Sequence, residues 1–408
     1  MDKQVFHHST FTGLILLSGV DAPGVTQSLF ECLSPFAITI LDMEQVVIRG
    51  RLILTALIEL DPAHADGVED DLVELGAKLG LDVAIDFTDI DRLESSGLSQ
   101  SKALQLVVLA KELKPHAIAK IAAVINGHKG NVERFRRTAA YPLTAIEFDI
   151  SIPHGESESD LQRDLAELAL AQGIDLAIEA GGLNRRSKRI VLLDMDSTFI
   201  QQEVIDLLAE EAGVGSQVKA ITERAMRGEL DFTQSLTART ELLAGLTDEA
   251  LVAIRSRITL TPGARTLVRT LHRLGHKVGI VSGGFTNVIA DLVEEMGLDY
   301  FQANTLEVVD GKLSGKIVGS VVDRAAKARF LKEFADNEGV PLSQTIAVGD
   351  GANDLDMLKA AGLGIAFNAK PAVKAEASAS INTPYLDAIL YLMGIPREEI
   401  EAADREAL

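Results

Sequence analysis

The alternation of apolar and polar positions repeats itself within residues 1–182 of the chain. Residues 80–85 read GLDVAI and residues 173–178 read GIDLAI, an offset of 93 positions. The apolar run LILLSG at residues 14–19 has a counterpart, LVVLAK, at residues 106–111, an offset of 92. A nearly constant offset predicts two copies of one structural unit.

Both copies predict the same order of elements. Each begins with an apolar run typical of a strand, followed by a helix that starts near a proline, Pro23 or Pro115. Two more strands, an acidic amphipathic helix and a last short strand follow. The order βαββαβ predicts two ferredoxin-like α+β domains, at residues 1–95 and 96–182, each followed by a polar linker.

Beyond residue 189 the pattern changes to apolar, strand-like runs separated by helical stretches. This order predicts a third domain, residues 183–408, with an α/β fold in which crossover helices cover a parallel sheet. Residues 204–258 contain no comparable run and predict a helical insertion. Sites in such sheets form at the carboxyl ends of the strands. The apolar runs are RIVLL at residues 189–193, KVGIVSGG at 277–284, TIAVGD at 345–350 and LGIAF at 363–367.

Composition narrows the possible functions. The chain has 408 residues, 47% of them hydrophobic, and a formal net charge of −21, which argues against unspecific binding to nucleic acid or to anionic membranes. Its single cysteine, Cys32, excludes an intramolecular disulfide and suits a reducing compartment. The first residues show no signal-peptide pattern, and no apolar run approaches the roughly 20 residues of a membrane span. We therefore expect a cytoplasmic protein whose partners include neither nucleic acid nor membranes.

Two carboxylates, Asp194 and Asp196, follow directly after the first strand of the predicted third domain. With a spacing of two on an extended segment, both side chains can point the same way. Asp194 can attack phosphorus as a nucleophile, while Asp196 can protonate the leaving alkoxide and then activate water. Two anions beside a phosphate need a cation, and Asp350 would complete a Mg²⁺ site with them, since this ion prefers hard oxygen ligands. Alone, such a pair of aspartates could equally be a turn.

Other segments supply groups suited to a phosphate. Ser282 precedes Gly283 and a second glycine at a helix start, which offers a hydroxyl and exposed N–H groups to phosphate oxygens. Lys327 would neutralise charge on a transferring phosphoryl group, although by itself it could be a solvated lysine. Asn353 and Asp354 open the helix after GDG, either as caps or as residues that orient the substrate site.

These motifs together resemble a known superfamily. DMDST at residues 194–198, SGG, the later lysine and GDGANDLDM resemble the four ordered motifs of the haloacid-dehalogenase superfamily, and residues 187–394 resemble its phosphoserine phosphatases throughout. The resemblance implies a Rossmann-like domain with a helical cap at about residues 204–258 and a Mg²⁺-dependent reaction through an aspartyl-phosphate. The expected reaction is hydrolysis of O-phospho-L-serine, the last step of L-serine biosynthesis. Relatives that keep a stable phospho-aspartate have a non-carboxylate at the position of Asp196.

The same resemblance places substrate recognition in the helical insertion. Glu203 would receive the ammonium group of the substrate and Arg239 its carboxylate, which suits the planar, bidentate guanidinium. Met226 and Phe232 correspond to apolar positions that close over the substrate. Considered alone, these residues would be surface charges and ordinary core positions of the insertion.

The two N-terminal units resemble ACT domains, which bind small amino acids at paired interfaces. GVDAPGV, beginning at Gly19, is similar to the strand-to-helix turn of that family, with Asp21 and Gly24 as further effector residues, although it could also be a plain helix start. In the second copy Asn131 stands where the family holds a ligand. The resemblance implies feedback by an amino acid in a homodimer. We expect L-serine, the reaction product, to be that effector.

Three functions stay open from the sequence. They are a phosphoserine phosphatase under amino-acid feedback, a phosphatase of the same superfamily for another small phosphate ester, and a sensor with a vestigial catalytic domain. Glu203 and Arg239 favour the first over the second, because their charges match a zwitterionic head group. The complete set of expected catalytic residues argues against the third.

Overall fold

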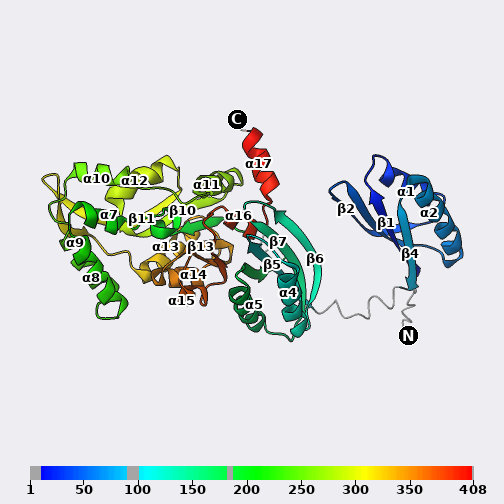
Figure 1. Cartoon of the computed structure of the whole chain (residues 1–408), viewed down its shortest axis with the longest axis horizontal. Helices are drawn as coiled ribbons and strands as arrows, with labels where there is room; N and C mark the ends of the chain where they lie inside the picture. The colour runs from blue at the N-terminus through cyan, green and yellow to red at the C-terminus, as the bar shows by residue number, and fades with distance from the viewer. Residues whose placement is uncertain (1–10, 90–100, 182–186, 407–408) are drawn as a thin grey trace, which may run out of the picture. The chain divides into compact units, whose positions relative to one another are not determined.

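A computed structural model describes residues 11–89, 101–181 and 187–406 of the chain. The chain divides into two compact units, Met1–Ser101 and Lys102–Leu408, and each is described by itself (Figure 1).

The first unit is a four-stranded antiparallel sheet with strand order β2-β3-β1-β4. Burial alternates along β1 and β3, so Ile15, Leu17 and Leu54 point into a common apolar core with residues of the two helices. The elements are β1 (Phe11–Val20), α1 (Val25–Leu33), β2 (Thr39–Ile48), β3 (Arg51–Glu59), the short helix η1 (Pro62–His64), α2 (Ala65–Leu79) and β4 (Asp82–Asp89).

The second copy has the same topology. Its strand order, β8-β5-β7-β6, corresponds to β4-β1-β3-β2 of the first. The glycines that begin the repeated motif, Gly80 and Gly173, both end a helix with a positive φ, of 66° and 63°. The predicted βαββαβ fold of both copies is therefore confirmed. The elements are β5 (Ser101–Ala110), α4 (Pro115–Gly127), β6 (Asn131–Ala139), β7 (Thr144–Pro153), α5 (Glu158–Gln172) and β8 (Asp175–Ala180).

The remaining residues form an α/β fold around a parallel sheet, as predicted, and its parallel strands lie in the order β10-β9-β13-β14-β15. A hairpin, β11–β12, extends this sheet beyond β10, and neither it nor β15 was predicted. The strands are β9 (Ile190–Leu193), β10 (Lys277–Phe285), β11 (Tyr300–Val309), β12 (Lys312–Val318), β13 (Thr345–Gly349), β14 (Leu363–Phe367) and β15 (Ala379–Ile381).

The insertion between β9 and β10 is helical, as expected, and it begins after an irregular turn, η3 (Met195–Phe199). Its helices are α7 (Val204–Glu211), α8 (Gly215–Met226), α9 (Phe232–Glu241) and α10 (Asp248–Arg255). The helices around the sheet are α11 (Ala264–Arg273), α12 (Thr286–Glu295), α13 (Arg324–Asn337), α14 (Leu355–Ala360), α15 (Pro371–Lys374), α16 (Ala388–Leu392) and α17 (Arg397–Glu406), with short turns η4 (Leu342–Gln344) and η5 (Ala352–Asp354).

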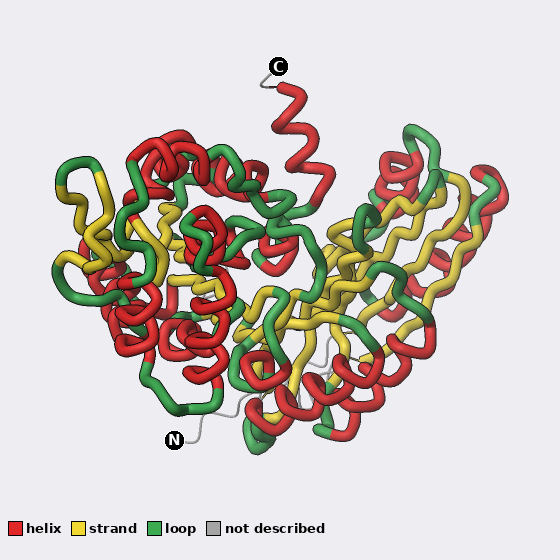
Figure 2. The backbone as a smooth tube through the Cα atoms, turned by 60° about the vertical axis from the view of Figure 1, so that its left-hand side comes forward, coloured by secondary structure: helices red, strands yellow, loops and turns green. Residues whose placement is uncertain are grey.

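Within the second unit, one sheet of 11 strands joins the second ferredoxin-like copy to the α/β part (Figure 2). The junction is an antiparallel pairing of β15 with β8. Next to it, the backbone N–H of Asn382 donates to Oδ2 of Asp175 at 2.7 Å, and the Asn382 amide donates to the other oxygen. A second link is the ion pair of Lys188 with Glu179, at 3.6 Å. Nothing in the sequence pattern indicated this junction.

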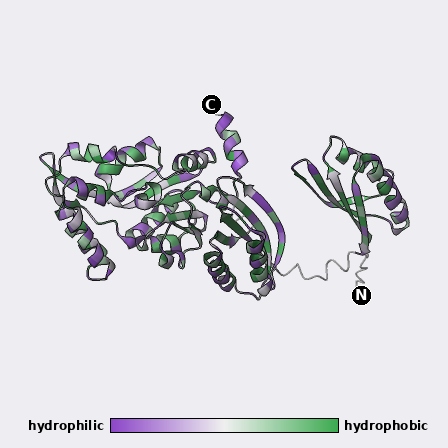
Figure 3. Cartoon of the chain, in the orientation of Figure 1, coloured by the Kyte–Doolittle hydropathy of each residue, from purple (hydrophilic) through white to green (hydrophobic). Residues whose placement is uncertain are grey.

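Apolar residues gather inside both units, whereas the last helix, α17, is hydrophilic over most of its length (Figure 3). The strands β9, β13 and β14 are buried along their whole length, as expected for parallel strands covered on both faces. Among the described residues, no helix combines the length and the apolar character that crossing a membrane requires.

Candidate active site

Asp194 follows directly after β9 and begins the site. Its backbone N–H donates to the carbonyl of Val348 on β13 at 2.8 Å, and the chain then turns sharply, with a φ of 55° at Ser197. Oδ1 of Asp194 accepts a hydrogen bond from the N–H of Met195 at 2.8 Å, which restricts rotation of the carboxylate. Met195 itself is buried in the main apolar core and so faces away from the site, as expected.

Lys327 lies on α13 and is completely buried. Its Nζ is 2.7 Å from Oδ1 of Asp194 and donates to Oδ1 of Asp354 at 2.6 Å. Burial would lower the pKa of this lysine, but the two carboxylates outweigh burial and raise it. Lys327 is therefore a fixed positive charge in contact with Asp194.

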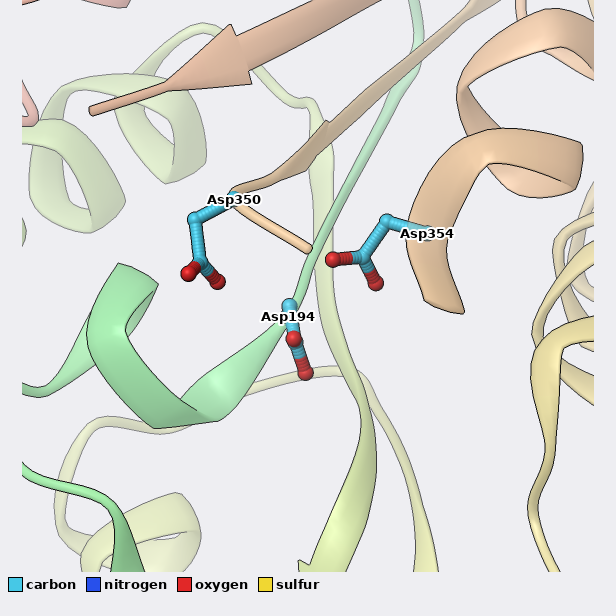
Figure 4. A group of neighbouring side chains, drawn as sticks. All are labelled: Asp194, Asp350 and Asp354. Atoms are coloured by element: carbon cyan, nitrogen blue, oxygen red, sulfur yellow. The ribbon is translucent and has the colours of Figure 1, made fainter. Parts of the chain in front are cut away.

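Three carboxylates converge at the ends of β9 and β13 (Figure 4). Among the described residues, Asp194, Asp350 and Asp354 each offer an oxygen, and these oxygens lie within 4.8 Å of one another. Asp354 is hydrogen-bonded through both oxygens, to Lys327 and to the N–H of Gly351 at 3.0 Å. The predicted metal set contained Asp194 and Asp350, but its third member was Asp196, whose side chain does not belong to this cluster.

The pKa values of Asp194, Asp196 and Asp350 are raised. Burial, and after it the charge of Asp354, raises the pKa of Asp194 well above its usual range. Burial and then Asp354 raise the pKa of Asp350 to about 7, and burial and then Glu203 raise that of Asp196 to about 8. Negative charge at this end of the sheet therefore exceeds what one lysine balances. Hard carboxylate oxygens with excess negative charge are a donor set that fits a divalent cation.

Residues 282–284, the irregular end of β10 that we call the SGG loop, lie beside these acids. Ser282 is fully buried, and its Oγ accepts a hydrogen bond from the N–H of Gly284 at 2.8 Å. A Cβ at Gly284 would lie 3.0 Å from Oδ2 of Asp196, and a Cβ at Gly283 would lie 3.2 Å from the ring of Phe232 on α9. The loop thus contacts the predicted general acid on one side and the helical insertion on the other.

The insertion brings two charged residues toward the same place. Glu203 directly precedes α7, and its side chain accepts a hydrogen bond from the hydroxyl of Ser197 at 2.6 Å. Arg239 on α9 is half-buried; burial lowers its pKa, while the charges of Asp206, Glu203 and Asp196 act in the opposite direction. These three carboxylates are therefore near enough to influence the Arg239 guanidinium. An anionic and a cationic group are available next to the carboxylate cluster.

Close packing in GDGAND explains its glycines. A Cβ at Gly349 would lie 2.4 Å from Cγ of Asp354, and one at Gly351 would lie 2.1 Å from Oδ1 of Asn353. Only glycine allows this approach of backbone to side chain. Asn353 is thus packed against the turn that carries Asp350. Met226 is the last residue of α8, and its side chain is outside the described part of the chain.

The sequence matches known families in all three regions. Residues 188–362 match the haloacid dehalogenase-like hydrolases, and residues 12–86 and 103–179 each match the ACT domain family. The chain is 50% identical to a phosphoserine phosphatase of Streptomyces coelicolor over 96% of this chain and 94% of that relative. It is 46% identical to a phosphoserine phosphatase of Mycobacterium tuberculosis over 96% and 95% of the two chains.

The chain belongs to the phosphoserine phosphatase family. It is a phosphatase of the haloacid-dehalogenase type that carries two ACT domains, as the resemblance implied. Among solved structures, a haloacid-dehalogenase family hydrolase from Salmonella enterica serovar Typhi superposes with a TM-score of 0.62. The identity is 31%, over 71% of this chain and 98% of that one.

In this phosphatase the predicted effector residues lie in both compact units. Gly19 is buried near the end of β1. Asp21 is exposed and its N–H donates to the carbonyl of Gly50, and Gly24 precedes α1 with a φ of 93°. Asn131 is the first residue of β6 and is exposed. Its amide donates to Glu133 at 3.3 Å.

Two polar contacts of this phosphatase went unrecognised in the sequence, although both lie within its motifs. Thr198 donates from its hydroxyl to Oδ1 of Asp350 at 3.3 Å, and Asp354 supports Lys327 rather than acting only as a helix cap. The run DMDST contained the signal for Thr198, since a hydroxyl two residues after an acid pair can reach a neighbouring strand end. The partner of Asp354 lies 27 residues away and left no local signal.

Proposed function

We propose that this chain hydrolyses O-phospho-L-serine to L-serine and phosphate through an aspartyl-phosphate on Asp194. The observation that supports this most is the joining of two kinds of group in one site. Asp194 is held against Lys327 at the strand ends, and Glu203 and Arg239 lie beside them on the insertion. The first pair suits a phosphoryl group, and the second suits the ammonium and carboxylate of an amino acid.

The proposed reaction has two half-reactions. In the first, an oxygen of Asp194 forms a bond to phosphorus while the bond between phosphorus and the serine oxygen breaks. Asp196 gives its proton to that departing oxygen. In the second, Asp196 takes a proton from water, whose oxygen bonds to phosphorus as the bond to Asp194 breaks. Asp194 is thereby regenerated, and phosphate leaves.

Mg²⁺ is the proposed cofactor. Asp194, Asp196 and Asp350 remain the proposed ligand residues, because Asp354 is already hydrogen-bonded through both oxygens. When bound, the ion supplies positive charge next to the phosphoryl oxygens.

The other site residues have proposed roles at the two ends of the substrate. Lys327 adds a second positive charge beside the phosphoryl group. Ser282 and the N–H of Gly283 donate to phosphoryl oxygens, and Asn353 lines the same end. Phe232 and Met226 cover the substrate from the insertion.

Phosphate release from a panel of esters tests the substrate. O-phospho-L-serine should give the highest kcat/KM, ahead of O-phospho-L-threonine, glycerol phosphate and nitrophenyl phosphate, and Asp194→Asn should be inactive on all of them. Arg239→Ala should lose about 2–4 kcal/mol in kcat/KM on phosphoserine and little on nitrophenyl phosphate, because only the former has a carboxylate. Arg227→Ala, on the exposed surface of the insertion, is the matched control.

A different ranking of the esters would favour a phosphatase of the same superfamily that acts on another small phosphate ester. If wild-type enzyme prefers another ester, and if Arg239→Ala weakens all substrates equally, then the chemistry stands but the substrate assignment is wrong.

The ACT domains extend the proposal to regulation. L-serine is the proposed effector, and its proposed binding residues are the turn from Gly19 to Gly24 and Asn131. The proposed assembly is a cytoplasmic homodimer. Each chain has sensor domains at residues 1–95 and 96–182 and a catalytic domain at residues 183–408. Asp21→Ala and Asn131→Ala should each weaken the allosteric part of the inhibition by serine. This part persists at saturating substrate, whereas competitive inhibition by serine at the active site is relieved. Both substitutions are on exposed side chains, whereas a side chain at Gly24 would also strain the backbone.

A further inference from the structure

Asn304 is a buried polar residue on β11 that no motif contains. Its side chain is only 1% exposed, although it lies on a strand that is otherwise lined by apolar or half-buried residues. A buried amide must be matched by partners, and its partners therefore indicate what it does.

The ladder between β10 and β11 is interrupted next to Asn304. Val281 pairs with Gln302, but the following pair is Phe285 with Asn304, so residues 282–284 leave the regular register. These are the residues of the SGG loop. Backbone groups that leave a ladder in a buried place need other hydrogen-bond partners.

The amide of Asn304 supplies one of those partners. Its Nδ2 donates to the carbonyl of Gly283 at 2.8 Å. In a trans peptide the carbonyl of one residue and the N–H of the next point in opposite directions. Holding the Gly283 carbonyl therefore directs the N–H of Gly284 the other way, where it donates to Oγ of Ser282 at 2.8 Å. Asn304 in this manner sets the orientation of the loop that faces the acids.

The other half of the same amide holds a second segment. Oδ1 of Asn304 accepts a hydrogen bond from the N–H of Val322 at 2.8 Å. The next residue, Asp323, caps α13 by accepting from the N–H of Ala326 at 2.8 Å, and α13 carries Lys327. The Asn304 side chain thus connects the SGG loop with the start of α13, the helix that carries Lys327.

We propose that Asn304 is a positioning residue for phosphoryl transfer. It sets the separation and orientation of the SGG loop relative to Lys327. It acts through these groups and does not itself touch the phosphoryl group. The inference rests on the proposed function of the loop and the lysine as phosphoryl-binding groups. Positioning of this kind matters because a displacement of about 1 Å can reduce turnover about 100-fold.

Asn304→Asp tests the proposal, because aspartate has the same shape and keeps the acceptor for Val322 but cannot donate to the Gly283 carbonyl. We expect kcat to fall about 10- to 100-fold. The inhibition constant of inorganic phosphate should rise about tenfold, since the loop is misoriented. The inhibition constant of L-serine as a competitive inhibitor at the active site should stay within about twofold, because Glu203 and Arg239 are untouched.

Asn287→Asp is the matched control. Asn287 lies on α12 and makes the same pair of bonds to one residue of β11, donating to the carbonyl of Leu306 at 3.1 Å and accepting from its N–H at 2.8 Å. It does not hold the SGG loop. Asn287→Asp should lower the melting temperature as Asn304→Asp does, yet it should leave the inhibition constant of phosphate unchanged.

Wild-type values of kcat and of phosphate inhibition in Asn304→Asp would overturn the proposal, as would equal changes in phosphate and serine inhibition. If Asn304→Asp does not fold, Asn304→Ser, which retains a small donor and acceptor, is measured against the same criteria. All variants are also assayed on nitrophenyl phosphate. A wild-type enzyme that cleaves this ester but not phosphoserine would refute the proposed substrate and leave the test of Asn304 intact.

Discussion

The last strands of the two ferredoxin-like copies, β4 and β8, begin with nearly the same sequence but lie in different surroundings. Asp82 of GLDVAI is exposed, whereas its counterpart in GIDLAI, Asp175, is 4% exposed and accepts two hydrogen bonds from Asn382. β4 lies at the edge of a four-stranded sheet, but β8 lies between β5 and β15. Repeated sequence thus produces the same topology, while burial depends on the neighbouring strand.

The largest expected effect comes from removing the second copy together with the first. A variant without residues 1–100 should melt and turn over like the full chain, since the first copy is a separate compact unit. A variant without residues 1–186 loses β8 and leaves β15 as an open edge. We expect its melting temperature to fall by about 10 °C, which corresponds to about 3 kcal/mol for a domain of this size. Equal melting of both variants, measured by calorimetry, would break the comparison.

The next effect concerns the repeated aspartate. Asp175→Ala removes the buried acceptor of two hydrogen bonds from the exposed residue Asn382 and should cost about 1–2 kcal/mol of local stability. Asp82→Ala, at the equivalent exposed position, should cost less than about 0.5 kcal/mol. Hydrogen exchange of the peptides that contain β15 and β4 measures each change separately. Similar losses at the two sites would mean that the junction contributes nothing to stability.

A smaller effect should be equal in the two copies. Gly80 and Gly173 end α2 and α5 with positive φ, and a Cβ at either one would meet no atom within 4 Å. Alanine at each should therefore cost about 1 kcal/mol, through the backbone conformation alone. Hydrogen-exchange rates of the amides in α2 and in α5 measure this loss of stability. A large difference between the two sites would show that local geometry is not what these glycines supply.

The smallest effect is a dependence on pH. Burial raises the pKa of Asp175 above its ordinary value of 3.8, although the bonds from Asn382 oppose this. As pH rises from about 4, the unfolded chain loses this proton before the folded chain does, so the contribution of the protonated group to stability declines. The free energy of unfolding of wild type relative to Asp175→Asn should therefore fall between pH 4 and the folded pKa. Chemical denaturation across this range measures it, with Asp82→Asn as control, and parallel curves for wild type and Asp175→Asn would contradict the prediction.

Much of the molecule could be predicted because its signals are local. The alternation in β1, the apolar runs of β9, β13 and β14, and the carboxylates at their ends all lie within short stretches of sequence. The β11–β12 hairpin was missed, since β11 mixes exposed and buried positions without a clear period and β12, which does alternate, is only 7 residues long. The two hydrogen bonds of the Asn304 side chain, to Gly283 and Val322, were missed because an isolated asparagine belongs to no sequence pattern.

The sequence by itself determined the repeat, the two βαββαβ units, the parallel sheet and the order of the motifs that contain Asp194, Ser282, Lys327 and Asp350. Each of these depends on the period of apolar residues or on groups that follow a strand directly. Tertiary structure alone decided that β8 joins β15 and that Asp354 supports Lys327. The bond between Asn382 and Asp175 spans 207 residues, and hydrogen bonding between such distant segments depends on where folding brings them, which no local pattern of residues encodes.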